Sequence, residues 1–259
     1  MSTIRTIPEL RAALRDRGDV GLVPTMGAFH EGHLSLFRAA RAESETFVVT
    51  LFVNPAQFAD AADLDRYPRD EERDVRLAEA EGVDVLFAPS ADELYPPGFQ
   101  TWVEVEELSR GLEGAFRPGH FRGVATLCLK LFNIVRPRRA YFGQKDAQQA
   151  AVLQRMVADL DLDLELRVLP TVRDAEGLAL SSRNALLSPE ERARGLTLPR
   201  ALHAGAAADD PVATALAALD GLEVDYVAVA DFEPPVLAGA IRIGSTRLID
   251  NVVLEGDPS

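Results

Sequence analysis

The sequence predicts an α/β protein with a parallel sheet wrapped by helices on both faces, a doubly wound fold, followed by a small α+β region. Three observations predict this class. Short apolar runs rich in β-branched residues alternate with longer helical patterns, the run 46–53 is apolar on both faces, and the pattern changes after Asn184. Strands and helices that alternate in this way form βαβ units, which build parallel sheets.

Predicted strands and helices alternate in order through the first part of the chain. The strands, taken from apolar runs, are residues 20–24, 46–53, 83–88, 139–143 and 163–169. The helices, taken from apolar residues at helical spacing, are residues 33–41, 70–81, 123–135 and 146–160. Pro89 ends the third strand and Pro137 the third helix, because proline cannot continue either element.

The region after Asn184 has a different pattern. Ser188 and Pro189 are typical of a helix start, an alanine-rich helical segment follows, and residues 224–229 and 247–254 are strand-like. We therefore predict two domains, residues 1–184 and residues 185–259.

The composition excludes several classes of protein. The chain has 259 residues, of which 47% are hydrophobic and 26% charged, so it has material for a packed core and is not a disordered or coiled-coil protein. The net charge of −14 argues against a nucleic acid partner, which would require clustered basic residues. An anionic ligand must therefore bind in a local basic pocket.

No apolar run is long enough for a signal peptide or a transmembrane helix, so we expect a soluble, cytoplasmic protein without a membrane partner. The single cysteine, Cys128, excludes an internal disulfide. Its apolar, helical surroundings favour a buried structural thiol over a reactive one.

Two histidines, His30 and His33, lie at the turn between the first strand and the first helix, beside Gly27 and Gly32. Ligands of parallel α/β sheets bind at the carboxyl ends of strands, where helix N-termini attract phosphate. Three residues apart, the two imidazoles can point the same way and donate hydrogen bonds to charge that develops on a nucleotide α-phosphate. The alternatives are solvated or capping histidines, and a zinc site, which would need further ligands.

Other polar residues follow later strands. Gln57 can present an amide to a polar substrate, while Lys145 and Asp146 can contact a phosphate and a ribose. The hydroxyls and guanidinium of residues 181–183 suit the β- and γ-phosphates of a nucleotide or a departing pyrophosphate. The respective alternatives are an ordinary loop residue, a solvated helix start, and a helix cap or turn.

Three residues are open to a structural or a functional interpretation. Arg117 is interpreted as a pocket or lid residue, and the role of His120 is left open, because a basic, glycine-containing loop is equally a lid or a plain connection. Asp74 is a candidate ligand of Mg²⁺, but the acidic stretch 70–74 is also typical of a solvated first helical turn.

Taken together, the motifs resemble those of a known family. The spacing His-x-Gly-His after a first strand is similar to the signature of the nucleotidylyltransferase superfamily, and the string from Pro24 to Leu36 resembles that of the pantothenate synthetase family. The family's other landmarks follow in order, at residues 52–58, 67–69, 117–124, 141–149, 172–173, 177–184 and 246–251. The resemblance covers residues 20–190 strongly and the tail that follows them loosely.

The resemblance implies a Rossmann-like sheet, a second domain that closes over ATP, and a homodimer formed through the first domain. It implies an ATP-dependent ligase that uses Mg²⁺ and condenses pantoate with β-alanine through a pantoyl adenylate, releasing AMP and pyrophosphate. His30, His33 and Lys145 are the implied catalytic residues, and Gln57 and Gln149 the implied pantoate-binding residues. The implied ATP-binding residues are Pro24, Met26, Gly27, His30, His33, Gly143, Lys145, Asp146, Val172, Leu180, Ser181, Ser182 and Arg183.

Two rival functions remain. A plain nucleotidylyltransferase acting on a phosphorylated substrate would need cations where Gln57 and Gln149 are neutral, and a nucleotide-binding regulatory protein would release no AMP. Ala147 and Leu180 stand where the family usually has an aromatic residue and methionine, and we expect altered packing rather than lost chemistry. The tail is shorter than is typical of the family, so the sequence does not establish whether the second domain closes over ATP.

Overall fold

The computed structural model of the protein describes residues 1–58 and 60–254. The chain divides into two compact units, one of Met1–Phe142 and Val152–Leu169, the other of Gly143–Ala151 and the chain from Pro170 on. The domain boundary expected between residues 184 and 185 stays a prediction, because packing units need not coincide with domains. Residues 255–259 of the expected second domain lie outside the described residues.

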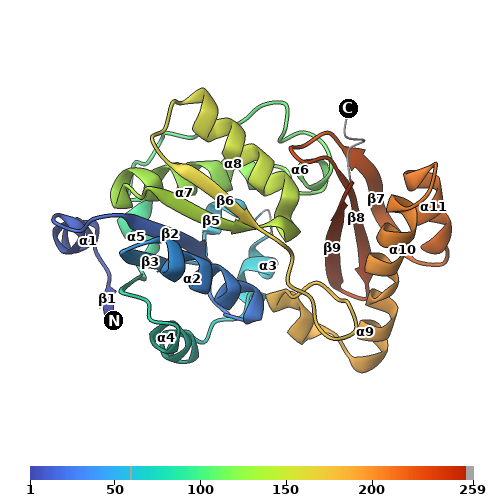
Figure 1. Ribbon diagram of the computed structural model, residues 1–259, viewed down its shortest axis with the longest axis horizontal. Helices are drawn as coiled ribbons and strands as arrows, with labels where there is room; N and C mark the ends of the chain where they lie inside the picture. Colours follow the sequence, from blue (N-terminus) through green and yellow to red (C-terminus); the bar gives the residue numbers. More distant parts are fainter. Residues whose placement is uncertain (59, 255–259) are drawn as a thin grey trace. The chain divides into compact units, whose positions relative to one another are not determined.

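A six-stranded parallel sheet forms the centre of the first unit (Figure 1). Its strand order is β1-β4-β3-β2-β5-β6. The strands are β1 (Ser2–Ile4), β2 (Val20–Thr25), β3 (Thr46–Leu51), β4 (Val85–Phe87), β5 (Arg139–Gly143) and β6 (Glu165–Leu169). After β2 the chain adds β3 and β4 on one side and then β5 and β6 on the other, while β1 forms the edge beside β4. The order therefore reverses between β2 and β5, the position at which ligands of open α/β sheets bind.

Helices cover both faces of this sheet, because successive strand residues are buried on opposite sides. Leu22 and Val48 belong to one apolar cluster with side chains of α1, α7 and α8, whereas Val23 and Val49 belong to another with side chains of α2 and α4. The helices are α1 (Ile7–Leu14), α2 (Glu31–Glu43), α3 (Ala61–Arg66), α4 (Glu71–Ala80), α5 (Ala91–Leu94), α6 (Glu113–Phe116), α7 (His120–Val135) and α8 (Ala147–Asp159). The predicted doubly wound fold is confirmed.

The second unit contains a three-stranded antiparallel sheet of β7 (Glu223–Ala230), β8 (Val236–Ile243) and β9 (Thr246–Val253). Two helices, α10 (Thr197–Ala206) and α11 (Pro211–Ala218), pack on this sheet, and Leu202 of α10 shares a buried cluster with Leu237 of β8. A shorter helix, α9 (Pro189–Gly195), precedes them. The predicted small α+β region is confirmed.

Several bounds differ from those expected, and several elements were missed. The helix expected at 123–135 begins at His120, after Gly119 in a left-handed conformation (φ 79°). The helix expected at 146–160 begins at Ala147, because residues 144–146 form a 3-10 turn, η2. The missed helices are α1, α3, α5 and α6. The missed strands are β1, with only three residues, and β8, whose sequence VLAGAIRI is diluted by small residues that carry little strand preference. Among the described residues, no helix is long and apolar enough to cross a membrane.

Cys128 lies within α7 and is only 4% exposed. Burial raises the pKa of its thiol to about 12, so the reactive thiolate is scarce near neutral pH. We expect an aromatic disulfide reagent in neutral buffer to leave the native protein unlabelled and to label one thiol per chain after unfolding in guanidinium chloride. Stoichiometric labelling of the native protein within minutes would contradict the structural interpretation of this cysteine.

Candidate functional site

The turn between β2 and α2 has a backbone that requires glycine. Gly27 has a φ of 88°, which side chains rarely allow, and Ala28 follows with a φ of 53°. A Cβ atom at Gly27 would also lie 2.6 Å from Leu51 Cδ1 and 2.9 Å from Asp74 Oδ2. The turn is therefore packed tightly against β3 and α4.

His30 and His33 cap helix α2 with one nitrogen each. The N–H of Gly32 donates to His30 Nδ1 at 3.2 Å, and the N–H of His30 donates to His33 Nδ1 at 3.3 Å. The ring centroids lie 4.2 Å apart. Since an accepting Nδ1 carries no proton, the neutral rings bear their proton on Nε2. The capping alternative therefore describes the Nδ1 atoms, while each Nε2–H has the chemistry of a phosphate donor.

Asp74 of α4 binds the backbone of the same turn. Its Oδ2 accepts the N–H of Ala28 at 2.7 Å and its Oδ1 accepts the N–H of Phe29 at 2.8 Å. The residue is 1% exposed, and burial raises the pKa of its carboxyl group even though the two backbone donors act in the opposite direction. The acidic helical turn is thus not simply solvated at this residue, because Asp74 satisfies two buried backbone donors.

Gln57 ends a 3-10 turn, η1 (Pro55–Gln57), that follows β3, and it is 8% exposed. Its Oε1 accepts from Asn54 Nδ2 at 3.1 Å, and its Nε2 lies 2.9 Å from Met26 Sδ. Asn54 is fixed in turn by the hydroxyl of Tyr95, which donates to Asn54 Oδ1 at 2.9 Å. The turns that follow β2 and β3 therefore meet through Met26 and Gln57.

His120 supports Gln57 through the main chain. Its Nδ1 lies 2.9 Å from the carbonyl oxygen of Gln57, and its Nε2 lies 3.0 Å from Arg117 Nη1. A guanidinium only donates, so Nε2 accepts and the neutral imidazole carries its proton on Nδ1, where it donates to Gln57. The ring of His120, left open by the sequence, thus joins Arg117 to the proposed substrate residue.

Gly123 of α7 lies against this turn so closely that a Cβ atom there would be 2.3 Å from the carbonyl oxygen of Ala56 and 2.7 Å from the nitrogen of Gln57. We expect Gly123→Ala to displace η1, and with it Gln57, and to cost about 1–3 kcal/mol of unfolding free energy. Urea denaturation measures the loss. Gly111→Ala is the matched control, because a Cβ at Gly111 meets nothing within 4 Å, and equal stability of the two variants would contradict the expectation.

Strand β5 ends at Gly143, the residue at which the second unit begins, and the chain continues into η2 (Gln144–Asp146). Lys145 Nζ lies 3.6 Å from Asp146 Oδ1, so the two charges face each other. Gln149 lies in the first turn of α8, which begins only at Ala147, rather than in one continuous helix with Lys145. The lysine thus lies on a short turn whose geometry depends on its surroundings.

A hairpin precedes the Ser-Ser-Arg sequence of the second unit. Leu180 N–H donates to the carbonyl of Val172 at 2.9 Å, and Arg173 pairs with Ala179 in an antiparallel bridge. The 3-10 turn η3 (Ser182–Leu186) follows, capped by Ser181, whose Oγ accepts the N–H of Arg183 at 3.3 Å. The cap alternative therefore describes Ser181, and the backbone bond of Leu180 does not depend on the side chain that departs from the family.

The structure groups the predicted residues by unit. Those in the first unit lie at the ends of β2 and β3 or contact the turns that follow these strands. They are Pro24, Met26, Gly27, His30, His33, Gln57 and Asp74. The second unit contains the others, which are Gly143, Lys145, Asp146, Gln149, Val172, Leu180, Ser181, Ser182 and Arg183. Sequence reasoning did not assign roles to Asn54 and Tyr95. The position of Asn54, directly after a buried strand, was a usable signal, whereas nothing in the sequence singled out Tyr95.

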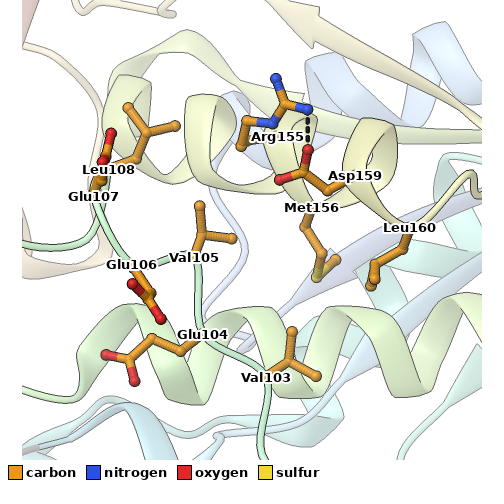
Figure 2. A pocket seen from close by; sticks show the side chains of 10 residues that line it. All are labelled: Val103, Glu104, Val105, Glu106, Glu107, Leu108, Arg155, Met156, Asp159 and Leu160. Carbon is orange, nitrogen blue, oxygen red and sulfur yellow. Dashed lines mark hydrogen bonds and ion pairs between the residues drawn. The ribbon is translucent and has the colours of Figure 1, made fainter.

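A separate cavity of about 380 Å³ lies elsewhere in the first unit (Figure 2). The segment from Val103 to Leu108 passes along the side of α8 that carries Met156, and Arg155 pairs with Asp159 at its rim. None of the predicted site residues lines it.

Comparison with known proteins gives one consistent match. The family model described as pantoate-beta-alanine ligase matches residues 2–253. A pantothenate synthetase of Roseiflexus castenholzii is 52% identical over 277 aligned residues, covering 98% of this chain and 100% of that protein. A pantothenate synthetase structure from Thermus thermophilus has a TM-score of 0.95 at 45% identity, covering 99% of this chain and 100% of that one.

A third relative carries ligands. The pantoate-beta-alanine ligase structure from Francisella tularensis, described as complexed with beta-gamma ATP and beta-alanine, has a TM-score of 0.88 at 33% identity and covers both chains fully.

Proposed function

Because the chain belongs to the pantoate-beta-alanine ligase family, we propose that it condenses pantoate with β-alanine through an enzyme-bound pantoyl adenylate. The overall reaction is an ATP-dependent condensation. In the first step a carboxylate oxygen of pantoate attacks the α-phosphorus of ATP, the bond from that phosphorus to the bridging oxygen breaks, and pyrophosphate leaves. In the second step the amine of β-alanine attacks the acyl carbon, the bond to AMP breaks, and the nitrogen loses a proton.

The observation that carries this proposal is the tautomer of the two histidines. With Nδ1 accepting from the backbone, His30 and His33 each bear a proton on Nε2. Donors held in advance stabilise the charge that builds on the α-phosphate during attack more than they stabilise the ground state. No side chain acts as a covalent nucleophile.

The second unit supplies the other polar and charged groups that contact ATP in the proposal. Lys145 acts as a point charge on a phosphate, Asp146 accepts from the ribose, and Ser181, Ser182 and Arg183 hold the β- and γ-phosphates and the departing pyrophosphate. The remaining ATP contacts are those that the resemblance implies, from Pro24, Met26, Gly27, Gly143, Val172 and Leu180.

Gln57 and Gln149 bind pantoate in this proposal. The buried amide of Gln57 is held by Asn54, while His120 holds the main-chain carbonyl of the same residue. Such an amide suits the hydroxyl and carboxylate groups of a small hydroxy acid. Two neutral amides do not suit the additional phosphate of a phosphorylated acceptor, which is why the ligase is favoured over a plain nucleotidylyltransferase.

Mg²⁺ enters the proposal as part of the substrate, Mg·ATP. Among the residues that the structure describes, no group of three or more His, Cys, Asp or Glu side chains is placed to hold a metal ion. Both oxygens of buried Asp74 already accept backbone N–H groups, whereas Mg²⁺ prefers octahedral oxygen ligands with several waters. Asp74 as a ligand of Mg²⁺ stays a prediction, which the variant Asp74→Asn tests.

We further propose a homodimer formed through the first domain, a cytoplasmic location and no nucleic acid partner. The dimer follows from the family resemblance, and the location is the expectation drawn from the sequence. The net charge of −14 supports the absence of a nucleic acid partner.

One assay tests the reaction. The protein is incubated with ATP, Mg²⁺ and pantoate, with and without β-alanine, and the nucleotide and acid products are separated. We expect AMP and pantothenate when both acids are present, and pantoate-dependent exchange of labelled pyrophosphate into ATP when β-alanine is omitted. Release of ADP would indicate an acyl phosphate instead of an adenylate, and binding of ATP without AMP release would indicate a regulatory protein.

A further inference from the structure

Strand β9 contains the landmark Thr246–Asn251, to which neither the sequence nor the proposed mechanism gives a role. The last two residues of this landmark are polar yet almost completely buried, with Asp250 3% and Asn251 5% exposed. Buried polar side chains require hydrogen-bond partners, so the partners of these two residues indicate what they do.

Asn251 binds the turn that carries Lys145. Its Nδ2 donates to the carbonyl oxygens of Gln144 and Lys145, both at 2.9 Å, and its Oδ1 accepts from Gln144 Nε2 at 3.2 Å. Both protons of the Asn251 amide and its oxygen are thus directed at this turn. No smaller or charged side chain reproduces this pattern, because it requires two donors and one acceptor on one short side chain.

The two accepting carbonyls have a special relation to Lys145. The carbonyl of Gln144 belongs to the peptide plane that precedes the Cα atom of Lys145, and the carbonyl of Lys145 belongs to the plane that follows it. Peptide planes are rigid, so holding both oxygens fixes the two backbone dihedral angles of Lys145 and the direction of its side chain. A 3-10 turn of three residues has few hydrogen bonds of its own to do this.

Asp250 serves the hairpin before Ser181 in the same way. Its Oδ2 and Oδ1 accept from Arg173 Nη1 at 2.6 Å and Nη2 at 2.9 Å, a two-bond pairing that fixes the guanidinium plane. Arg173 also donates to the carbonyl of Gly177 at 3.2 Å, at the tip of the hairpin. The N–H of Asn251 donates to Asp250 Oδ1 at 2.8 Å, which links the two residues.

We infer that Asn251 is a positioning residue that sets the direction of Lys145, and that Asp250 does the same for the hairpin leading to Ser181. This inference rests on the proposed function, in which Lys145 contacts a phosphate of ATP. Strand β9, which lies outside the parallel sheet, thus sets the geometry of Lys145 and of the hairpin that leads to Ser181.

The test uses Asn251→Asp, which keeps the size of the side chain and removes both donors, and Asn251→Ser, which keeps one donor. We expect the kcat of pyrophosphate exchange to fall about 10- to 100-fold in Asn251→Asp and less in Asn251→Ser, because small misplacements of a reacting group are costly. The KM for pantoate should change less than about twofold, because an interaction confined to the transition state lowers kcat rather than ground-state binding.

The matched control is Asn133→Ala. Asn133 also donates its amide to a backbone carbonyl, that of Leu129 at 2.9 Å, but it lies on the exposed side of α7. This variant should exchange pyrophosphate at the rate of the unmodified protein. If the unmodified protein shows no exchange, the proposed function fails. If the unmodified protein is active and Asn251→Asp matches Asn133→Ala, the positioning role fails.

Two measurements separate positioning from general loss of structure. In a Lys145→Ala background, Asn251→Asp should cause little further loss of exchange, since residues that act through one another are not additive. Amide hydrogen exchange, which needs no activity, should speed up in peptides covering residues 144–151 and stay unchanged in those covering β2 and α2. Additive losses, or unchanged amide exchange at 144–151, would overturn the inference.

Discussion

Replacement of His30 by asparagine is expected to lower the rate of pantoate-dependent pyrophosphate exchange about 10²- to 10³-fold, with little change in stability. Asparagine is a good N-cap residue, so its oxygen can still accept the N–H of Gly32. Its NH₂ group lies closer to the main chain than Nε2 of histidine, so no donor remains at the position proposed to contact the α-phosphate. The substitution therefore separates capping from catalysis, which alanine would remove together.

Single-turnover and steady-state exchange assays measure this effect, with urea denaturation as the stability check. His33→Asn should behave similarly, because its Nδ1 also accepts a backbone N–H. His203→Asn, on the exposed side of α10, is the matched control and should leave the rate unchanged. Exchange at the normal rate in His30→Asn, or a loss of rate that merely follows a loss of stability, would refute the donor role.

The second large effect is expected for Asp74→Asn, which should lower the unfolding free energy by about 1–3 kcal/mol. The two oxygens of Asp74 accept from Ala28 and Phe29, and an amide can supply only one oxygen in their place. Its NH₂ group then faces a backbone N–H, so one buried donor loses its acceptor. The turn that carries His30 is expected to shift as a result, and exchange activity to fall with stability.

Asp70→Asn on the same helix provides the control. Asp70 caps α4 by accepting the N–H of Arg73 at 3.0 Å, and asparagine caps equally well, so this variant should keep the stability of the unmodified protein. A titration of exchange activity against Mg²⁺ completes the test. If Asp74→Asn raised the Mg²⁺ requirement while stability stayed unchanged, Asp74 would be a metal ligand rather than a support of the turn.

The fold was largely predictable because buried parallel strands leave strong local signals. The run 46–53 is apolar at nearly every position, and the structure shows Val48 and Val49 buried in clusters on opposite faces. Strand β8 left a weaker signal, since Ala238, Gly239 and Ala240 derive their strand conformation from pairing with β7 and β9 rather than from their own preference. Tertiary pairing of this kind is not visible in a local pattern.

The chemistry-bearing residues were predictable from their position after strands, but their supports were not. His30, His33 and Gln57 follow β2 and β3 directly. Their supports come from distant parts of the chain, since Asp74 lies 46 positions from Ala28 and His120 lies 63 positions from Gln57. A side chain that acts on a backbone atom so far away in sequence leaves no spacing rule to read.

The contacts of Asn251 also bear on when the protein becomes competent during synthesis. The carbonyl of Lys145 is bound by a side chain that the ribosome adds 106 residues later. A growing polypeptide can therefore complete the parallel sheet and the turn that carries His30 and His33 before Asn251 is available. The turn that carries Lys145 lacks its hydrogen bonds to Asn251 until then. Chains that end before β9, through a premature stop or proteolysis, should keep the turn that carries His30 and His33 and lose adenylation, so adenylation requires synthesis to proceed at least through Asn251.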